Sequence, residues 1–357
     1  MPPLRYTPPV TANPPRNPPA PPVRFVHAPG RAPLAYTSRG RGLAIVLVPN
    51  VQMSHLVSEW AIPAVRQFSL SLARNHRLIR YDSTGSGLSP SASPRFDLES
   101  LAADIPALLD GLALDRAALF GNITGGLPAM TFASAYPGRV SHLVLWNSFA
   151  RNTDHGANPR LTSLFAMAAT DWELFTESIS QAALGWRDSE AARGWAATLR
   201  AATEPVSFHR YLAERQSWDV TDLLAHIQCP TLVLFDPTNR LASEERSREL
   251  AAAIPNATFM RATSESGMPD APTIALIEQF LRDAKTATFD RPPGGLSLRE
   301  VDVLRELATG ATNAEIAERL SISINTVARH LTHIYVKTGS SNRVEAVRYA
   351  ERRELVD

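Results

Sequence analysis

Short apolar runs alternate with longer amphipathic stretches over residues 23–284. Runs rich in Val, Ile, Leu and aromatic residues predict strands at 24–28, 34–39, 43–48, 77–82, 117–120, 140–146, 231–235 and 258–261. Apolar positions at helical spacing predict helices near 64–74, 98–112, 242–253 and 271–284, and another from about 124. Strands that alternate with helices of this length indicate a mainly parallel, doubly wound α/β sheet.

The alternation stops over residues 150–225, which are helical in pattern and hold four of the six tryptophans of the chain. Because this segment lies between the sixth and seventh predicted strands, we expect a helical cap over a pocket. The α/β domain is placed at 23–285. Residues 1–22 contain ten prolines and predict an extended tail, and the sequence TATFDRPPGG at 286–295 is typical of a linker.

The remaining residues, 296–357, predict a small all-α domain. Ser297 and Glu300 form one N-terminal capping box and Thr312 and Glu315 form a second, each followed by apolar residues at helical spacing. Strands are absent from the pattern. A compact helical module is therefore expected after the linker.

A tight turn joins two of these helices, and Ser323 is a suitable N-cap for the second. A helix, a tight turn and a second helix form the arrangement that enters the DNA major groove. The spacing resembles the LuxR-type (GerE) family along nearly all of residues 296–350. The residues that carry this resemblance are Leu296, Arg299, Glu300, Val303, Leu304, Ala308, Gly310, Asn313, Glu315, Ile316, Ala317, Leu320, Ile322, Ser323, Thr326, Val327, His330, Ile334, Lys337, Gly339 and Arg343.

The resemblance implies a transcription regulator that binds double-stranded DNA. By it, the helix from Ser323 to Lys337 lies in the major groove, and the last helix, 342–352, pairs two subunits into a homodimer. A helical module for protein contacts is the alternative. The residues expected to contact bases or phosphates are Thr312, Asn313, Asn325, Thr326, Arg329, His330, His333 and Lys337.

Three positions depart from the family pattern. Ala328 stands where a basic residue is usual, Thr338 where leucine is usual, and Ser340 where an aliphatic residue is usual. We expect the first change to move base recognition to Arg329. The other two are expected to loosen the packing of the last helix.

Residues 23–284 resemble the α/β-hydrolase fold, in the branch that is fused to cyclase or LuxR-type output domains. The resemblance implies the fold of this domain. It is carried by segments along most of the domain, namely Ser54–Trp60, Leu72–Asp82, Gly85–Ser89, Val140–Leu145, Gly185–Trp186 and Pro230–Leu234.

Catalysis in this fold requires a serine in a G-x-S-x-G turn, with a histidine base and an acid behind it. The corresponding turn here is Gly121-Asn122-Ile123-Thr124-Gly125, so Ile123 stands in the place of the nucleophile. Asn239 occupies the position of the acid, and Gly267/Met268 occupies that of the histidine. We therefore expect no hydrolase activity and assign no catalytic residue.

Other side chains offer a displaced triad as an alternative. Asp236, close to Asn239, is either a substitute acid or a solvated loop residue. His55, His142 and His155 are the candidates for the base of such a triad, and the first two match family positions that are not catalytic. An esterase-like hydrolase tethered to a DNA-binding domain is the hypothesis that follows from such a triad.

A pocket that no longer turns over a substrate suits a sensor of a small apolar effector. Backbone N–H groups near Val51 and at Thr124 are expected to hold a carbonyl or carboxylate of that ligand. Ile123, Trp186 and Met268 are expected to complete the pocket. The alternative is a hydrolase-like domain that serves only as a scaffold for dimerisation or protein contacts.

Composition adds three constraints. The net charge is +1, and residues 296–357 hold nine basic and nine acidic side chains, so DNA contacts must come from the placement of charge. Cys229 is the single cysteine, is expected to be a buried structural thiol, and fits a cytoplasmic protein. No apolar run approaches the roughly 18 residues that span a membrane. The sequence indicates no metal ion and no cofactor.

Overall fold

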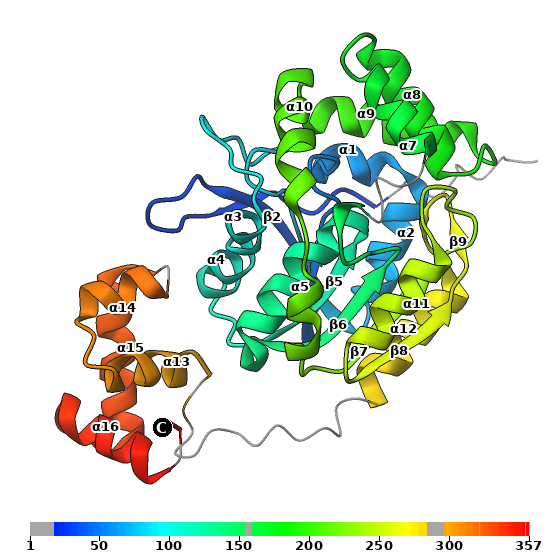
Figure 1. Ribbon diagram of the computed structural model, residues 1–357. Coiled ribbons are helices and arrows are strands. Elements are labelled where there is room, and N and C mark those ends of the chain that lie inside the picture. Colours follow the sequence, from blue (N-terminus) through cyan, green and yellow to red (C-terminus); the bar gives the residue numbers. More distant parts are fainter. Residues whose placement is uncertain are drawn as a thin grey trace, which may run out of the picture.

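The computed structural model describes residues 18–153, 159–283, 296, 298–320, 322–353 and 355–356 (Figure 1). Over these residues the chain forms an α/β part, which ends at residue 283, and a helical part that begins at 298. The expectations for residues 1–17 and for the 286–295 linker lie outside the described residues. The carbonyl of Pro18 accepts a hydrogen bond from Trp60 Nε1 at 3.1 Å.

Eight strands of the described chain form one sheet in the order β1-β2-β4-β3-β5-β6-β7-β8. β1 and β2 pair in antiparallel fashion, and all pairings from β4 to β8 are parallel. This confirms the predicted doubly wound α/β architecture. The strands are β1 Arg24–Val26, β2 Leu34–Arg39, β3 Leu43–Val48, β4 His76–Tyr81, β5 Ala117–Asn122, β6 Val140–Trp146, β7 Thr231–Phe235 and β8 Ala257–Arg261.

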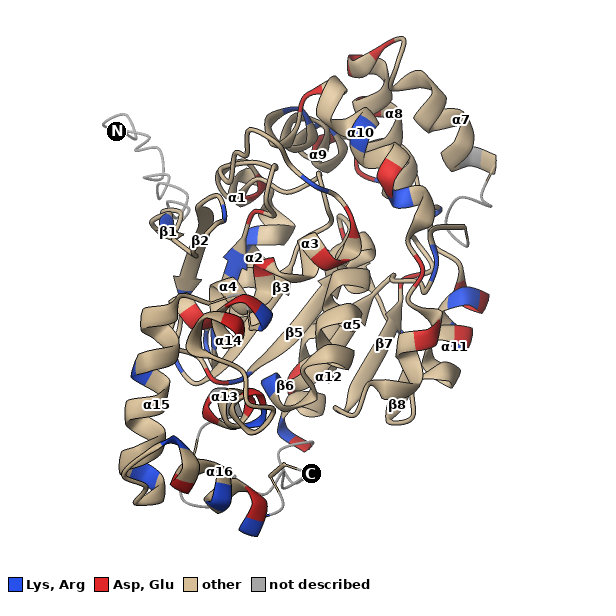
Figure 2. Ribbon diagram, turned by 60° about the vertical axis from the view of Figure 1, so that its left-hand side comes forward, with Lys and Arg blue, Asp and Glu red and all other residues tan. Residues whose placement is uncertain are grey.

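Helices cover both faces of this sheet (Figure 1). Strands β3, β5 and β7 carry no Lys, Arg, Asp or Glu, as Figure 2 shows, because parallel strands are buried on both sides. One apolar cluster joins the sheet to α2 and α12, and a second joins it to α3, α4, α5 and α11. The bounds are α1 Leu56–Ala61, α2 Pro63–Leu72, α3 Leu98–Ala102, α4 Asp104–Gly111, α5 Gly126–Ala135, α11 Glu244–Ala253 and α12 Ala271–Asp283.

The single helix expected over 98–112 is interrupted at Ala103 and forms α3 and α4 instead. Pro106 lacks the N–H that would donate to the carbonyl of Ala102 in an unbroken helix. The break follows from this missing donor. Ala103 keeps right-handed helical dihedrals (φ −69°, ψ −12°), and both helices bury apolar residues against the sheet.

The segment between β6 and β7 forms a layer of helices above the sheet (Figure 1). Aromatic rings fill it: the Phe208 ring centroid lies 5.2 Å from those of Trp172 and Phe175 and 5.6 Å from that of Tyr211. This layer occupies the segment that the sequence marks as a cap. Its helices are α7 Pro159–Met167, α8 Trp172–Ala183, α9 Ser189–Ala202 and α10 Pro205–Glu214, followed by the 3₁₀ turns η3 Arg215–Ser217 and η4 Thr221–His226.

Four helices form the carboxyl-terminal part and bury an apolar core of their own. They are α13 Leu298–Ala308, α14 Asn313–Arg319, α15 Ile324–Thr338 and α16 Arg343–Arg352. The capping box of Thr312 and Glu315 at the start of α14 is confirmed. The capping box that was expected at Ser297 depends on a residue outside the described set.

Candidate functional site

The turn that follows β5 has the geometry of a nucleophile elbow, with an isoleucine at its tip. Ile123 has φ +51°, a left-handed backbone conformation that is a genuine outlier for a β-branched residue. A Cβ on Gly125 would lie 2.2 Å from the carbonyl oxygen of Pro49, so only glycine fits there. The chain thus keeps a strained turn although its side chain cannot act as a nucleophile.

A cavity of about 120 Å³ lies between this turn and the cap helices. Its walls combine apolar cap side chains with polar residues from the carboxyl ends of the strands. It is lined by Asn50, Met53, Glu59, Asn122, Ile123, Thr124, Asn147, Leu161, Phe165, Ile179, Ser180, Ala183, Leu184, Trp195, Leu199, Phe208, Tyr211, Arg215, Asn239, Leu241, Ala242 and Gly267.

The three positions of the expected triad meet in this cavity. Ile123, Asn239 and Gly267 all line it, and no histidine is found among its described lining residues. Gly267 and Met268, where the base was expected, lie in a tight hairpin of β9 (Ser264–Glu265) and β10 (Met268–Pro269). The fold therefore brings together an isoleucine, an asparagine and a glycine, none of which supplies a nucleophile, an acid or a base.

Asp236 is 1% exposed, so the expectation of a solvated loop residue is wrong. Its carboxylate accepts hydrogen bonds from Thr238 N at 2.8 Å, Thr238 Oγ1 at 2.9 Å and Ser264 Oγ at 2.5 Å. These donors stabilise the turn after β7. Asp236 does not line the cavity, which speaks against its use as a substitute acid.

The candidate bases also have structural contacts. His55 is the N-cap of α1, where its Nδ1 accepts the N–H of Ser58 at 3.2 Å. His142 is buried and packs edge-on against Phe280, with ring centroids 5.6 Å apart. His155 lies outside the described residues. Neither described histidine reaches the cavity.

One of the two backbone donors expected to hold a ligand is already in use. The N–H of Val51 donates to Thr124 Oγ1 at 2.9 Å, and this hydroxyl in turn donates to Asn50 Oδ1 at 2.6 Å. A donor at 2.7–3.1 Å defines the place of an oxyanion in this type of site. The Thr124 side chain therefore stands where a ligand oxygen was expected, and the assignment of Val51 to ligand binding is corrected.

Two further pocket expectations need correction. Trp186, which has φ +58° in the turn after α8, is 64% exposed and does not line the cavity. Met268 is buried but lines a smaller neighbouring cavity of about 20 Å³. Ile123 and Thr124 do line the main cavity.

Sequence reasoning missed both charged residues of the cavity wall. Glu59, on α1, pairs with Arg80 of β4, yet burial raises the pKa of the Glu59 carboxyl above its ordinary value. Arg215 is 3% exposed; its Nε donates to Asn152 Oδ1 at 2.6 Å and its Nη1 to Tyr211 Oη at 3.0 Å. Glu59 lies in Ser54–Trp60, a segment that resembles the α/β-hydrolase fold. The sequence thus marked this segment but gave Glu59 no role in the pocket.

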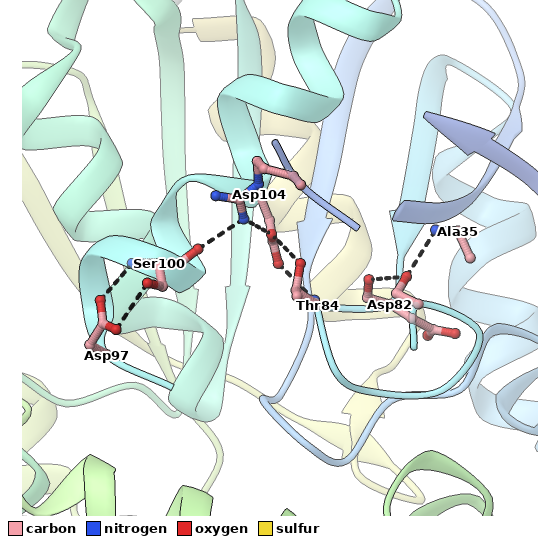
Figure 3. A network of polar contacts seen from close by, with 8 residues as sticks. Ala35, Asp82, Thr84, Asp97, Ser100 and Asp104 are labelled. Carbon is pink, nitrogen blue, oxygen red and sulfur yellow. Dashed lines mark hydrogen bonds and ion pairs between the residues drawn. The ribbon is translucent and has the colours of Figure 1, made fainter. Parts of the chain in front are cut away.

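A buried carboxylate fixes the start of the helix that carries Glu59. Asp82 accepts the N–H of Leu56 at 3.1 Å and that of Leu88 at 2.9 Å. Its carbonyl accepts from Ser89 Oγ, which itself accepts the N–H of Ala35, and both distances are 2.8 Å (Figure 3). Burial raises the pKa of the Asp82 carboxyl to about 7.

The neighbouring loop is held by a second buried carboxylate. Asp104 accepts from the N–H of Thr84 at 2.9 Å, from Thr84 Oγ1 at 2.7 Å and from Arg31 Nη2 at 2.5 Å (Figure 3). Because Asp104 is fully buried, these donors offset the cost of removing its charge from water. The two carboxylates together fix the loop that follows β4.

The helix-turn-helix is formed by α14, a tight turn and α15. In the turn, the N–H of Ile322 donates to the carbonyl of Ala317 at 2.9 Å, and Ser323 Oγ caps α15 by accepting the N–H of Thr326 at 3.0 Å. Asn325 and Arg329 are exposed on α15, and His333 follows one turn later with 55% of its side chain exposed. The Nδ1 of His333 also lies 3.8 Å from Glu300 Oε1, whereas Asn325 and Arg329 project from α15 into solvent.

Lys337, expected to contact a DNA phosphate, makes an ion pair within the helical part of the chain. Its Nζ donates to both carboxylate oxygens of Glu300, at 2.7 and 3.0 Å, and Glu300 is 2% exposed. This ion pair ties α15 to α13. The lysine ammonium compensates a buried carboxylate within the domain, while 37% of the lysine side chain stays exposed, and the phosphate contact of Lys337 stays a prediction.

The remaining residues of the expected DNA surface cap helices or lie beside the exposed set. Thr312 Oγ1 accepts the N–H of Glu315 at 3.3 Å in the capping box, and Thr326 Oγ1 lies 2.7 Å from Ser323 Oγ. Asn313 and His330 are half-buried. The hydroxyls of Thr312 and Thr326 therefore make contacts that stabilise the starts of α14 and α15.

The two departures expected to loosen the last helix are hydrogen-bonded instead. Thr338 Oγ1 donates to the carbonyl of Ile334 at 2.7 Å and lies 2.8 Å from Ser340 Oγ. Gly339, with φ +68°, ends α15 in the left-handed conformation. The hydroxyls of Thr338 and Ser340 therefore have hydrogen-bond partners in the turn before α16.

Burial of Cys229 is confirmed: it is 1% exposed, and burial raises the pKa of its thiol to about 11. Among the described residues, no cluster of His, Cys, Asp and Glu could hold a metal ion. None of the described helices has both the length and the apolar character needed to cross a membrane.

Two families match the chain. Residues 58–267, more than half of the chain, match the family described as "alpha/beta hydrolase fold", and residues 295–350 match "Bacterial regulatory proteins, luxR family". RutD of Pseudomonas savastanoi pv. phaseolicola, named as a carbamate hydrolase, is 28% identical over 196 residues, which cover 53% of this chain and 76% of that protein. The oxygen regulatory protein NreC of Staphylococcus aureus is 38% identical over 87 residues, 24% of this chain and 40% of that protein.

Solved structures of esterases are similar to the α/β part. An esterase from Thermogutta terrifontis aligns with a TM-score of 0.62 and 22% identity, covering 74% of this chain and 99% of that one. The esterase RhEst1 from Rhodococcus sp. ECU1013 aligns with a TM-score of 0.63 and 18% identity, covering 73% of this chain and 99% of that one. At this level of identity the likeness shows the fold alone.

Proposed function

Because the chain belongs to the alpha/beta hydrolase fold family and also carries a DNA-binding domain of the luxR family, we propose that it is a transcription regulator whose hydrolase-fold domain binds a small apolar effector without turning it over. The observation that carries the proposal is the cavity at the elbow. Ile123, Asn239 and Gly267 occupy it where a nucleophile, an acid and a base would be needed.

The absence of catalysis is supported by the contacts of the candidate substitutes. Asp236 is used by Thr238 and Ser264, and the described histidines lie outside the cavity. Residues of a triad act as a unit, so the loss of one member removes most of its rate enhancement. From the relative that is named as a carbamate hydrolase we infer only the fold of this domain, and we infer no substrate from it.

Ligand binding is supported by the chemistry of the walls. Most of the cavity is apolar, with rings from Phe165, Phe208 and Tyr211 and a few polar groups at the strand ends. Small-molecule sites have this composition. An effector that is not consumed reports its own concentration, which suits a regulator.

Communication with DNA is proposed to run through domain docking and dimerisation. The turn η2 (Pro137–Arg139) lies beside α13, and the nearby Asp115 carboxyl experiences the charges of Glu300 and Lys337. A ligand can shift such an arrangement only by its differential affinity for the two states. The homodimer, paired through α16, belongs to the same proposal.

The test replaces the residue at the tip of the elbow in the full chain. Ile123→Arg fills the cavity with a charged side chain, whereas Ile123→Leu keeps it apolar and is the matched control. We expect Ile123→Arg to regulate its promoter at a fixed level, whatever the growth condition, while the purified protein still binds operator DNA. Ile123→Leu should respond as the wild type does.

The outcome separates sensing from scaffolding. If Ile123→Arg is folded, as judged by its thermal unfolding, and its promoter still responds as in the wild type, the cavity is not the sensor. The hydrolase-fold domain would then serve dimerisation or protein contacts. The separate substitution Arg329→Ala tests DNA binding alone. Loss of operator binding in that variant would say nothing about whether the cavity is the sensor.

A further inference from the structure

The main cavity and the smaller one beside it share one polar wall. Asn50, Glu59, Asn122 and Trp195 line both. Glu59 comes from α1, Asn122 from the end of β5, and Asn50 from the loop after β3. Three elements that are distant in sequence therefore bring amide and carboxylate groups to one place beside the elbow.

Acceptors dominate this wall. A carboxylate offers about four acceptor sites. Arg80 and the backbone N–H of His55 are the donors that face the Glu59 carboxylate. Glu59 lines the cavity and keeps 12% of its side chain exposed. The buried Oδ1 of Asn122 has no hydrogen-bond partner within the described part of the chain. A buried acceptor without a donor is unfavourable, and a ligand donor would relieve it.

One of the two backbone donors that this fold would offer to a carbonyl is already in use. The Val51 N–H is taken by Thr124 Oγ1, and Asn50 Oδ1 is taken by the same hydroxyl. A ligand carbonyl would have to displace an internal hydroxyl that already makes two hydrogen bonds. Elsewhere in the main cavity, the buried Nδ2 of Asn147 is a donor without a partner in the described part of the chain. At the wall that the two cavities share, the group without a partner is the acceptor Oδ1 of Asn122, so this place favours a ligand that donates hydrogen bonds.

We propose that the cavity takes a small, largely apolar molecule whose polar end is a hydrogen-bond donor, an amine or a hydroxyl group, placed between Glu59 and Asn122. The inference rests on the proposed ligand-sensing function and specifies its ligand. The cavity, at about 120 Å³, is close in size to an engineered cavity of about 150 Å³ that holds benzene. A single ring with one donor group fits this space.

The experiment uses the full chain and four probes with the same ring: benzylamine, benzyl alcohol, benzaldehyde and benzoate. Each is titrated by calorimetry, and the melting temperature is measured at increasing concentration. We expect the amine and the alcohol to bind and to raise the melting temperature, because they bind only the native state. The aldehyde and benzoate, which lack a donor, should bind clearly more weakly than the amine and the alcohol.

Glu59→Gln tests the site itself, since glutamine keeps the shape and an acceptor oxygen but loses the charge. The affinity for benzylamine should fall about tenfold, as expected for the loss of a charge-assisted hydrogen bond, and that for benzyl alcohol should change little. Glu244→Gln is the matched control: Glu244 also pairs with arginines, Arg248 and Arg261, but lies outside the cavity. It should bind all probes as the wild type does.

Asn122→Leu removes the second acceptor at similar volume and does not disturb the pair with Arg80, so it covers the case in which Glu59→Gln does not fold. It should weaken both donor probes. Benzaldehyde or benzoate binding as tightly as the donor probes would overturn the donor inference and leave ligand sensing intact. Binding of none of the four probes would also overturn it. Failure of ligand sensing is recognised separately, by a normal promoter response in Ile123→Arg.

Discussion

The N–H of Val51 donates to Thr124 Oγ1 at 2.9 Å, so the protein fills with its own hydroxyl the place where a ligand oxygen would bind at the elbow. The same hydroxyl donates to Asn50 Oδ1 at 2.6 Å. Thr124 is 2% exposed and Val51 1%, so neither group exchanges this contact for water. One of the two donors expected at the elbow is therefore already used within the protein.

Thr124→Ala should lower the free energy of unfolding by about 1–3 kcal/mol, because it leaves the buried Val51 N–H and Asn50 Oδ1 without their shared partner. Thr124→Ser keeps the hydroxyl and should cost clearly less. Urea unfolding of the full chain measures both. Equal stability of the alanine and serine variants would show that the hydrogen bonds contribute nothing.

Ile123→Ser should not hydrolyse short-chain nitrophenyl esters above the background rate. A serine at the tip would find Asn239 and Gly267 in the cavity and no base to activate it. The wild type should likewise remain unlabelled by fluorophosphonates that react with active serines. Labelling that disappears when one residue is replaced would reveal a displaced triad and would falsify the proposed loss of catalysis.

Stability should depend on pH through Asp82, whose pKa is raised by burial from the ordinary 3.8 to about 7. Between these values the folded state binds the proton more tightly, so this contribution is complete below about pH 4 and is lost as the pH rises to about 7. Asp82→Asn does not titrate. Relative to the wild type it should gain on the order of 4 kcal/mol between pH 4 and pH 8.

The control for this experiment is Asp97→Asn. Hydrogen bonds from Ser100 and Arg95 lower the pKa of Asp97, against the opposing effect of its partial burial. Its contribution is therefore present above about pH 4 and lost in more acidic solution. A constant difference between Asp82→Asn and the wild type across pH 4 to 8 would contradict the assignment to Asp82.

Arg329→Ala should reduce operator affinity by about 1–3 kcal/mol and relax the preference at one base pair, as expected for a contact to a base edge. Arg329 is exposed on α15, one turn beyond Asn325. Binding of the full chain to a set of operators with single base changes measures both effects. Uniform weakening on every sequence would instead indicate a phosphate contact.

Lys337→Ala should destabilise the helical domain by about 1–3 kcal/mol, less than for a fully buried pair because the lysine is partly exposed. It leaves the Glu300 carboxylate, 2% exposed, without its ammonium partner. In the background of Glu300→Gln the same substitution should have little further effect on stability. A reduced slope of DNA affinity with salt, at unchanged stability, would instead support the predicted phosphate contact of Lys337.

The sequence by itself determined the order of strands and helices and the type of both domains. Alternating short apolar runs and amphipathic stretches fix a parallel sheet, because only helices on both faces bury such strands. The glycines at Gly121 and Gly125, spaced as in a G-x-S-x-G turn, also identified the elbow. These features depend on local spacing, which is visible in one dimension.

Only the tertiary structure decided which polar groups remain open to a ligand or to DNA. Val51 and Thr124 are 73 positions apart, and Lys337 and Glu300 are 37 apart, so their pairing depends on how the elements pack. The same packing turned Trp186 to the surface and brought Glu59 and Arg215 to the cavity wall. Spacing along the chain predicts the face of a helix or strand, but a hydrogen bond between distant segments depends on distances that packing alone sets.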